Sequence, residues 1–205
     1  MAKPGDFFIG VIDFFGILVP GAVLLFLHGE SLVNSVGFQL GRSETVLWAS
    51  FLAASYVLGH FLLGLGVPLN RLLHLSRPAS KDKFYNEVKD IISLPPEVDE
   101  NRADAFYRAY SFVRLKSPSA LAEIERQMAD YKLFRSLTLV FAIDFLLVFL
   151  RGIAPSPRLL LSGTLFVLAV ARFLFLLGWT YRITFEYYAL LNSAHCGDPG
   201  EPPAA

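Results

Sequence analysis

Four long apolar runs constrain the fold of this chain more than any other feature of its sequence. The runs are roughly Phe7–Leu27, Val46–Leu69, Ser136–Leu150 and Leu159–Trp179. About 20 helical residues, each rising 1.5 Å, cross the apolar core of a bilayer. Hydrophobic residues make up 54% of the 205 residues, above the roughly 45–50% usual in soluble domains. We therefore predict an all-α fold: an integral membrane four-helix protein whose long helices extend into a small helical cytoplasmic domain.

Basic residues near the ends of these runs predict how the chain is oriented, because cytoplasmic loops carry an excess of Lys and Arg. On one side of the predicted bilayer lie Arg71, Arg77, Lys81, Lys83, Arg126, Lys132, Arg135 and Arg182. The opposite side carries Arg42, Arg151 and Arg158. This bias predicts a multi-pass protein of the plasma (inner) membrane with both termini and the 70–135 region in the cytoplasm.

The runs divide the chain into four predicted parts. Residues 1–70 hold the first two transmembrane helices and an outer loop, and 71–135 form a cytoplasmic helical insertion. Residues 136–193 hold the third and fourth transmembrane helices with a cytoplasmic extension. Residues 194–205 are rich in Gly and Pro, which predicts a disordered tail.

Within the insertion we expect helices over Lys81–Ser93, Glu100–Lys116 and Pro118–Leu150. The last begins with a serine cap, Ser117, followed by a proline, and no helix breaker separates it from the third apolar run. The fourth run also continues, through Leu191, with Arg182 and Glu186 at the spacing of an ion pair. Aromatic residues crowd this end of the run, so we expect them to pack on the aromatic stripes of the insertion.

Four ionisable residues interrupt the apolar runs: Asp13, His60, Asp144 and Arg172. A charge at bilayer depth costs roughly 2.5–3.5 kcal/mol on insertion scales, so it is paired, hydrated or used. Counting from the cytoplasmic ends places Asp144 and Arg172 both about 12–14 Å inside the membrane, which predicts an ion pair between them. The four residues are interpreted as an intramembrane polar cluster, which either lines a path or gate or only fixes helix packing.

Small residues recur at four-residue spacing on the second run, as Ala49/Ala53 and Ser55/Gly59. Such pairs let two helices approach closely. Packing within one chain and association of several chains explain them equally well, and both interpretations remain open.

The sequence carries no pattern of catalytic, cofactor-binding or metal-binding residues, so no enzyme activity and no cofactor are expected. Its single cysteine is Cys196. Because the formal net charge is zero, direct nucleic-acid binding is not expected. The basic cluster Arg71, Arg77, Lys81 and Lys83 is a candidate contact for lipid head groups or a partner. The same cluster is also explained by membrane topology alone.

The string Asp13–Gly21 (DFFGILVPG) and the overall layout resemble small bacterial membrane proteins with four crossings and a helical cytoplasmic insert. The resemblance implies membrane-disrupting effectors of phage defence. We therefore expect a non-enzymatic, oligomeric membrane effector or channel-like protein, bound to lipid and controlled through a cytoplasmic domain that contacts a soluble partner. Two alternatives remain open: a small proton-coupled transporter that uses the buried Asp, His and Arg residues, and a membrane anchor for a soluble partner.

Overall fold

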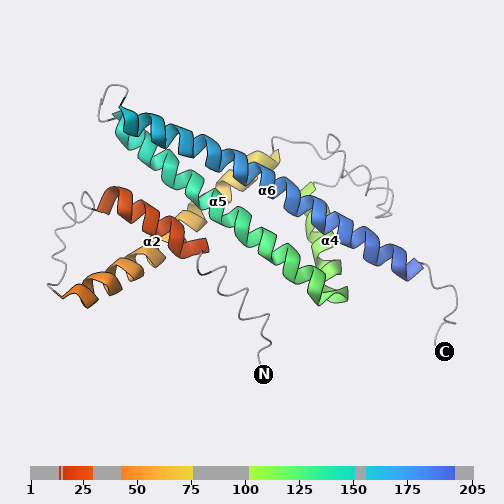
Figure 1. Ribbon diagram of the computed structural model, residues 1–205. Helices are drawn as coiled ribbons and strands as arrows, with labels where there is room; N and C mark the ends of the chain where they lie inside the picture. Colours follow the sequence, from red (N-terminus) through yellow and green to blue (C-terminus); the bar gives the residue numbers. More distant parts are fainter. Residues whose placement is uncertain (1–13, 15, 30–42, 76–101, 151–155, 197–205) are drawn as a thin grey trace. The chain divides into compact units, whose positions relative to one another are not determined.

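A computed structural model of the chain describes residues 14, 16–29, 43–75, 102–150 and 156–196. Every regular element in these ranges is an α-helix. The helices are Gly16–Gly29, α2 (Glu44–Leu75), α4 (Arg102–Lys116), α5 (Pro118–Leu150) and α6 (Pro157–Cys196). The all-α prediction is therefore confirmed (Figure 1).

Three of these helices are long and apolar enough to cross a membrane: Glu44–Leu69 of α2, Pro118–Leu150 and Pro157–Asn192. The first predicted crossing is only partly described. Its helix Gly16–Gly29 is apolar but shorter, and the amino-terminal part of Phe7–Leu27 lies outside the described residues. Three long apolar helices are thus compatible with a membrane protein.

Local sequence signals place the ends of α5 as expected. The Ser117 hydroxyl accepts a 3.4 Å hydrogen bond from the Ala120 N–H, and Pro118 opens the helix, as a serine cap followed by proline predicts. α4 is described from Arg102 to Lys116, within the predicted helix, and its predicted first two residues lie outside the described residues. α6 continues to Cys196, so residues 194–196, assigned above to the disordered tail, are helical. The predicted helix Lys81–Ser93 lies outside the described residues.

The chain forms two compact units, and α5 and α6 each contribute to both. The membrane unit draws on Met1–Leu69 and Met128–Leu177, and the second unit on Asn70–Gln127 and Gly178–Ala205. The membrane unit contains the predicted intramembrane residues that the structure describes. The second unit contains α4 and the aromatic end of α6.

In the membrane unit, α5 and α6 pack as antiparallel helices (Figure 1). Near the turn the Asp144 carboxylate accepts a hydrogen bond from Ser162, and further from it the Tyr131 and Phe173 rings lie 6.5 Å apart. Val140 and Phe173 are buried between the helices. Residues 151–155, between the two helices, lie outside the described residues.

Helix Gly16–Gly29 packs against α2 through glycines. A Cβ atom added at Gly21 would lie 1.8 Å from the Ser55 carbonyl oxygen, and one added at Gly59 would lie 1.9 Å from the Ile17 oxygen. The Ser55/Gly59 pair therefore serves packing within the chain. Ala53, by contrast, is exposed on α2.

The second unit is held by aromatic contacts between α4 and the end of α6, which confirms the predicted packing. The Phe106 and Tyr181 rings lie 4.6 Å apart, and Phe112 and Tyr188 lie 4.9 Å apart. The Tyr110 hydroxyl donates a 3.0 Å hydrogen bond to Glu125. Burial, and then the hydrogen bond and charge of Glu125, raise the pKa of Tyr110, so the bond persists throughout the physiological pH range.

Candidate functional site

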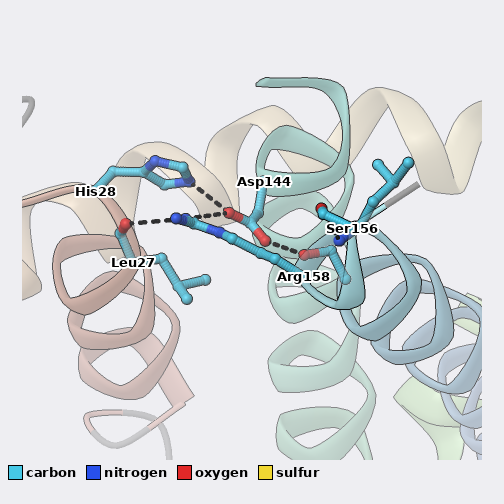
Figure 2. Close-up of polar contacts among 7 residues, drawn as sticks. Leu27, His28, Asp144, Ser156 and Arg158 are labelled. Atoms are coloured by element: carbon cyan, nitrogen blue, oxygen red, sulfur yellow. Dashed lines mark hydrogen bonds and ion pairs between the residues drawn. The ribbon is translucent and has the colours of Figure 1, made fainter. Parts of the chain in front are cut away.

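Asp144 is the centre of a polar cluster in the membrane unit (Figure 2). Its side chain is 3% exposed, and both carboxylate oxygens have partners. Arg158 Nη2 and His28 Nε2 each lie 3.1 Å from Oδ1, and the Ser162 hydroxyl donates to Oδ2. The carboxylate is thus neutralised and hydrogen-bonded in an interior where an unpaired charge would be costly.

The same cluster joins the ends of three helices. His28 lies one residue before the end of helix Gly16–Gly29, and Arg158 is the second residue of α6. Arg158 also donates a 3.4 Å hydrogen bond to the Leu27 carbonyl, one of the carbonyls that a helix end leaves without an internal partner. Because its side chain is 48% exposed, Arg158 links the buried carboxylate to the surface. We refer to Asp144, His28, Arg158 and Ser162 as the Asp144 cluster.

The predicted ion pair between Asp144 and Arg172 is wrong. The Arg172 guanidinium lies over the Phe134 ring, 5.9 Å from its centroid, so Arg172 is level with a residue ten positions before Asp144. Ten helical residues correspond to about 15 Å along the axis. The depth of each residue was predicted from assumed cytoplasmic ends of the helices, and these ends do not fix the register between α5 and α6. In the structure Asp144 lies opposite Ser162.

Arg172 is exposed on the outer side of α6. Besides Phe134, its guanidinium contacts the Phe175 ring at 5.4 Å. No carboxylate within the described residues pairs with it. Contacts of a cation with aromatic faces contribute about 0.5–1 kcal/mol each at exposed sites, which offsets only part of the cost of a charge at membrane depth.

His60 is also exposed, on α2, and its ring contacts Tyr56 edge to face at 4.6 Å. The predicted cluster therefore does not form as one site: Asp144 is buried among other partners, while His60 and Arg172 face outward. Asp13, the fourth member, lies outside the described residues.

The role of Arg135 in the structure was not predicted. The sequence pattern places it only among the basic residues that flank the third apolar run. Arg135 is 5% exposed and donates a 3.1 Å hydrogen bond from Nη2 to the Leu63 carbonyl of α2. A Cβ atom added at Gly66 would lie 2.5 Å from the Arg135 Nε atom. The glycine therefore leaves the space that the Arg135 side chain occupies. Pro68 lies inside α2, but the carbonyl that this proline leaves without a helix partner belongs to Gly64, four residues before it. The bond from Arg135 to the Leu63 carbonyl therefore had no signal in the sequence.

His28 and Arg158 were missed as partners of Asp144 because both lie at the ends of predicted runs, where polar residues are ordinary. Of the basic cluster, Arg77, Lys81 and Lys83 lie outside the described residues, as does the side chain of Arg71. No group of three or more His, Cys, Asp or Glu side chains in the described ranges is arranged to hold a metal ion.

Comparison of the chain with protein-family models, curated proteins and solved structures finds no match. The functional interpretation therefore depends on the geometry of the membrane unit.

Proposed function

We propose that the protein is a non-enzymatic membrane effector of the plasma membrane, in which several copies assemble into a channel-like structure. The cytoplasmic helical unit receives the controlling signal or soluble partner. Membrane disruption in phage defence is the role that this proposal assigns to the chain. Both termini lie in the cytoplasm in this arrangement.

The exposed guanidinium of Arg172 carries the proposal. Arg172 lies fifteen residues after Pro157, about 22 Å along α6, in a segment of membrane-spanning composition. Lipid tails offer it neither water nor a counter-charge, and two phenylalanine rings compensate only in part. An assembly in which this face of α6 borders a water-filled space removes the remaining cost.

The Asp144 cluster supports the same function by holding the helix ends together. Its three helices are joined by charged contacts, whereas the Arg172 guanidinium contacts the rings of Phe134 and Phe175 among the described residues. A transporter that uses Asp144 as a proton carrier has less support, because His28, Arg158 and Ser162 already occupy that carboxylate.

Dye release from vesicles tests the function. The full chain is placed in vesicles of phosphatidylethanolamine and phosphatidylglycerol that contain a self-quenched dye, with and without added cytoplasmic extract. We expect dye release by the wild-type protein, a loss of at least tenfold in the release rate for Arg172→Gln, and retention for Arg172→Lys. Arg126→Gln is the matched control, since Arg126 is an exposed arginine of the second unit. Wild-type protein that releases no dye under either condition contradicts the proposal.

A membrane anchor for a soluble partner is the second candidate, favoured by apolar side chains that the second unit leaves uncovered. Tyr107 is 63% exposed and Leu115 is 83% exposed on α4. In this case Tyr107→Ser and Leu115→Ser abolish retention of the partner on membranes, whereas Arg172→Gln has no effect on it.

A further inference from the structure

The two sides of α2 differ in what covers them. Successive residues of a helix are about 100° apart around its axis, so residues at spacings of three, four and seven share a side. The inner side carries Ser55, Gly59, Leu62 and Gly66, all buried. The opposite side carries Ala49, Ala53, His60 and Gly64, all exposed. We refer to these four residues as the outer stripe; the larger exposed side chains of Tyr56 and Val57 flank it.

His60 distinguishes the outer stripe from an ordinary lipid-facing surface. It lies sixteen residues after Glu44 and nine before Leu69, the ends of the apolar part of α2, so it is about 13 Å or more from either end. Among the described residues, the interaction found for its side chain is a T-shaped ring contact with Tyr56. A ring contact leaves the imidazole nitrogens without a hydrogen-bonding partner, and lipid tails supply none.

We propose that a second copy of this chain docks on the outer stripe of α2, with the two His60 imidazoles hydrogen-bonded to each other across the interface. The proposal rests on the self-assembly proposed above and names the surface that joins two copies into a dimer, the unit from which the larger assembly is built. Copies inserted in one orientation are related by rotation about the membrane normal, so His60 meets its own copy at the same depth. A neutral imidazole has one donor and one acceptor nitrogen, so two imidazoles complement each other.

The shape of the stripe fits a close approach of two α2 helices. Ala49, Ala53 and Gly64 present little side-chain volume, and a Cβ added at Gly64 meets nothing within 4 Å. The chain already packs α2 closely on its inner side, where Gly59 meets Ile17. Helices in membranes associate through such small residues and through single interhelical hydrogen bonds.

The same reasoning separates His60 from Arg172. Two Arg172 guanidinium groups meeting in a symmetric interface would repel each other, because both are always charged. Two His60 side chains attract each other when neutral. The outer stripe is therefore the surface that joins copies, and the Arg172 side of α6 is the surface that remains hydrated.

Cysteine cross-linking in vesicles tests the placement. In a Cys196→Ala background, which lacks the chain's single cysteine, Ala53→Cys and Gly64→Cys are oxidised with copper phenanthroline in phosphatidylethanolamine and phosphatidylglycerol vesicles. We expect disulfide-linked dimers for both. Ser55→Cys, buried on the inner side of the same helix, is the control and should remain monomeric. Dimers at Ser55→Cys alone, or at none of the three positions, overturn the proposal.

Substitutions of His60 test the hydrogen bond. Energy transfer between labelled copies, measured as lipid is added, gives the association constant. We expect His60→Leu to lower it about 3- to 30-fold, as loss of one interhelical hydrogen bond predicts, and His60→Asn to restore most of it. Phe61→Leu, an exposed neighbour off the stripe, should leave it unchanged. Equal association of His60→Leu and wild type overturns the role of His60.

The two experiments separate the interface from the function. Dye release without cross-linking on the outer stripe overturns the interface and leaves the effector function standing. Cross-linking on the stripe without dye release overturns the effector function and leaves the interface standing.

Discussion

The membrane unit has one side that the chain covers itself and one that it leaves open, and the two sides satisfy polar groups differently. On the covered side, Asp144 and Arg135 are buried and bonded to protein atoms. On the open side, the interactions of His60 and Arg172 with other described residues are contacts with aromatic rings. The difference separates residues that hold one chain together from residues that act between a chain and its surroundings. Substitutions on the two sides should therefore change different measured quantities.

The largest loss of stability is expected for Asp144→Ala. It leaves the buried His28 and the half-exposed Arg158 without their carboxylate. Because solvent reaches Arg158, we expect about 3 kcal/mol, the lower end of the range for breaking a buried ion pair from one side. Unfolding in mixed detergent micelles, followed by circular dichroism, measures this loss. Thr164→Ala is the control, because Thr164 is exposed and bonded only to the Leu160 carbonyl of its own helix. A loss below about 1 kcal/mol for Asp144→Ala would show that the cluster does not hold the helix ends.

A matched pair of glycines gives the next largest difference. Gly59→Ala drives a methyl group to 1.9 Å from the Ile17 carbonyl oxygen, a backbone atom that moves only with its helix. Overpacking of this kind typically costs about 1–3 kcal/mol, and we expect the upper end. Gly64→Ala, on the open side of the same helix, meets nothing and should be neutral or slightly stabilising, since alanine is the better helix former.

The same detergent unfolding measures both variants. Equal stability of the two would mean that helix Gly16–Gly29 does not pack on α2 through Gly59. Association of labelled copies provides a second readout, which Gly59→Ala should leave unchanged when the variant is folded.

The sequence predicted the helices better than it predicted their neighbours. The ends of α5 at Pro118 and Leu150 were predicted from composition and from the local cap, because these signals act within one helix. The partner of Asp144 was predicted wrongly because the register between two helices depends on the turn that joins them. His28 and Arg158 come from two different helices, and no spacing within the sequence brings them to Asp144. The position of Arg135 depended likewise on Leu63 and Gly66 of another helix.

The smallest loss of stability is expected for Arg172→Gln. The two phenylalanine contacts contribute about 0.5–1 kcal/mol each, and removing the charge also removes the cost of holding it at membrane depth. These two effects oppose each other, so the free energy of unfolding should change by less than about 1 kcal/mol. The loss of dye release predicted for the same variant then reflects function rather than unfolding. A destabilisation as large as that of Asp144→Ala would instead place Arg172 on the covered side, among the residues that hold the chain together.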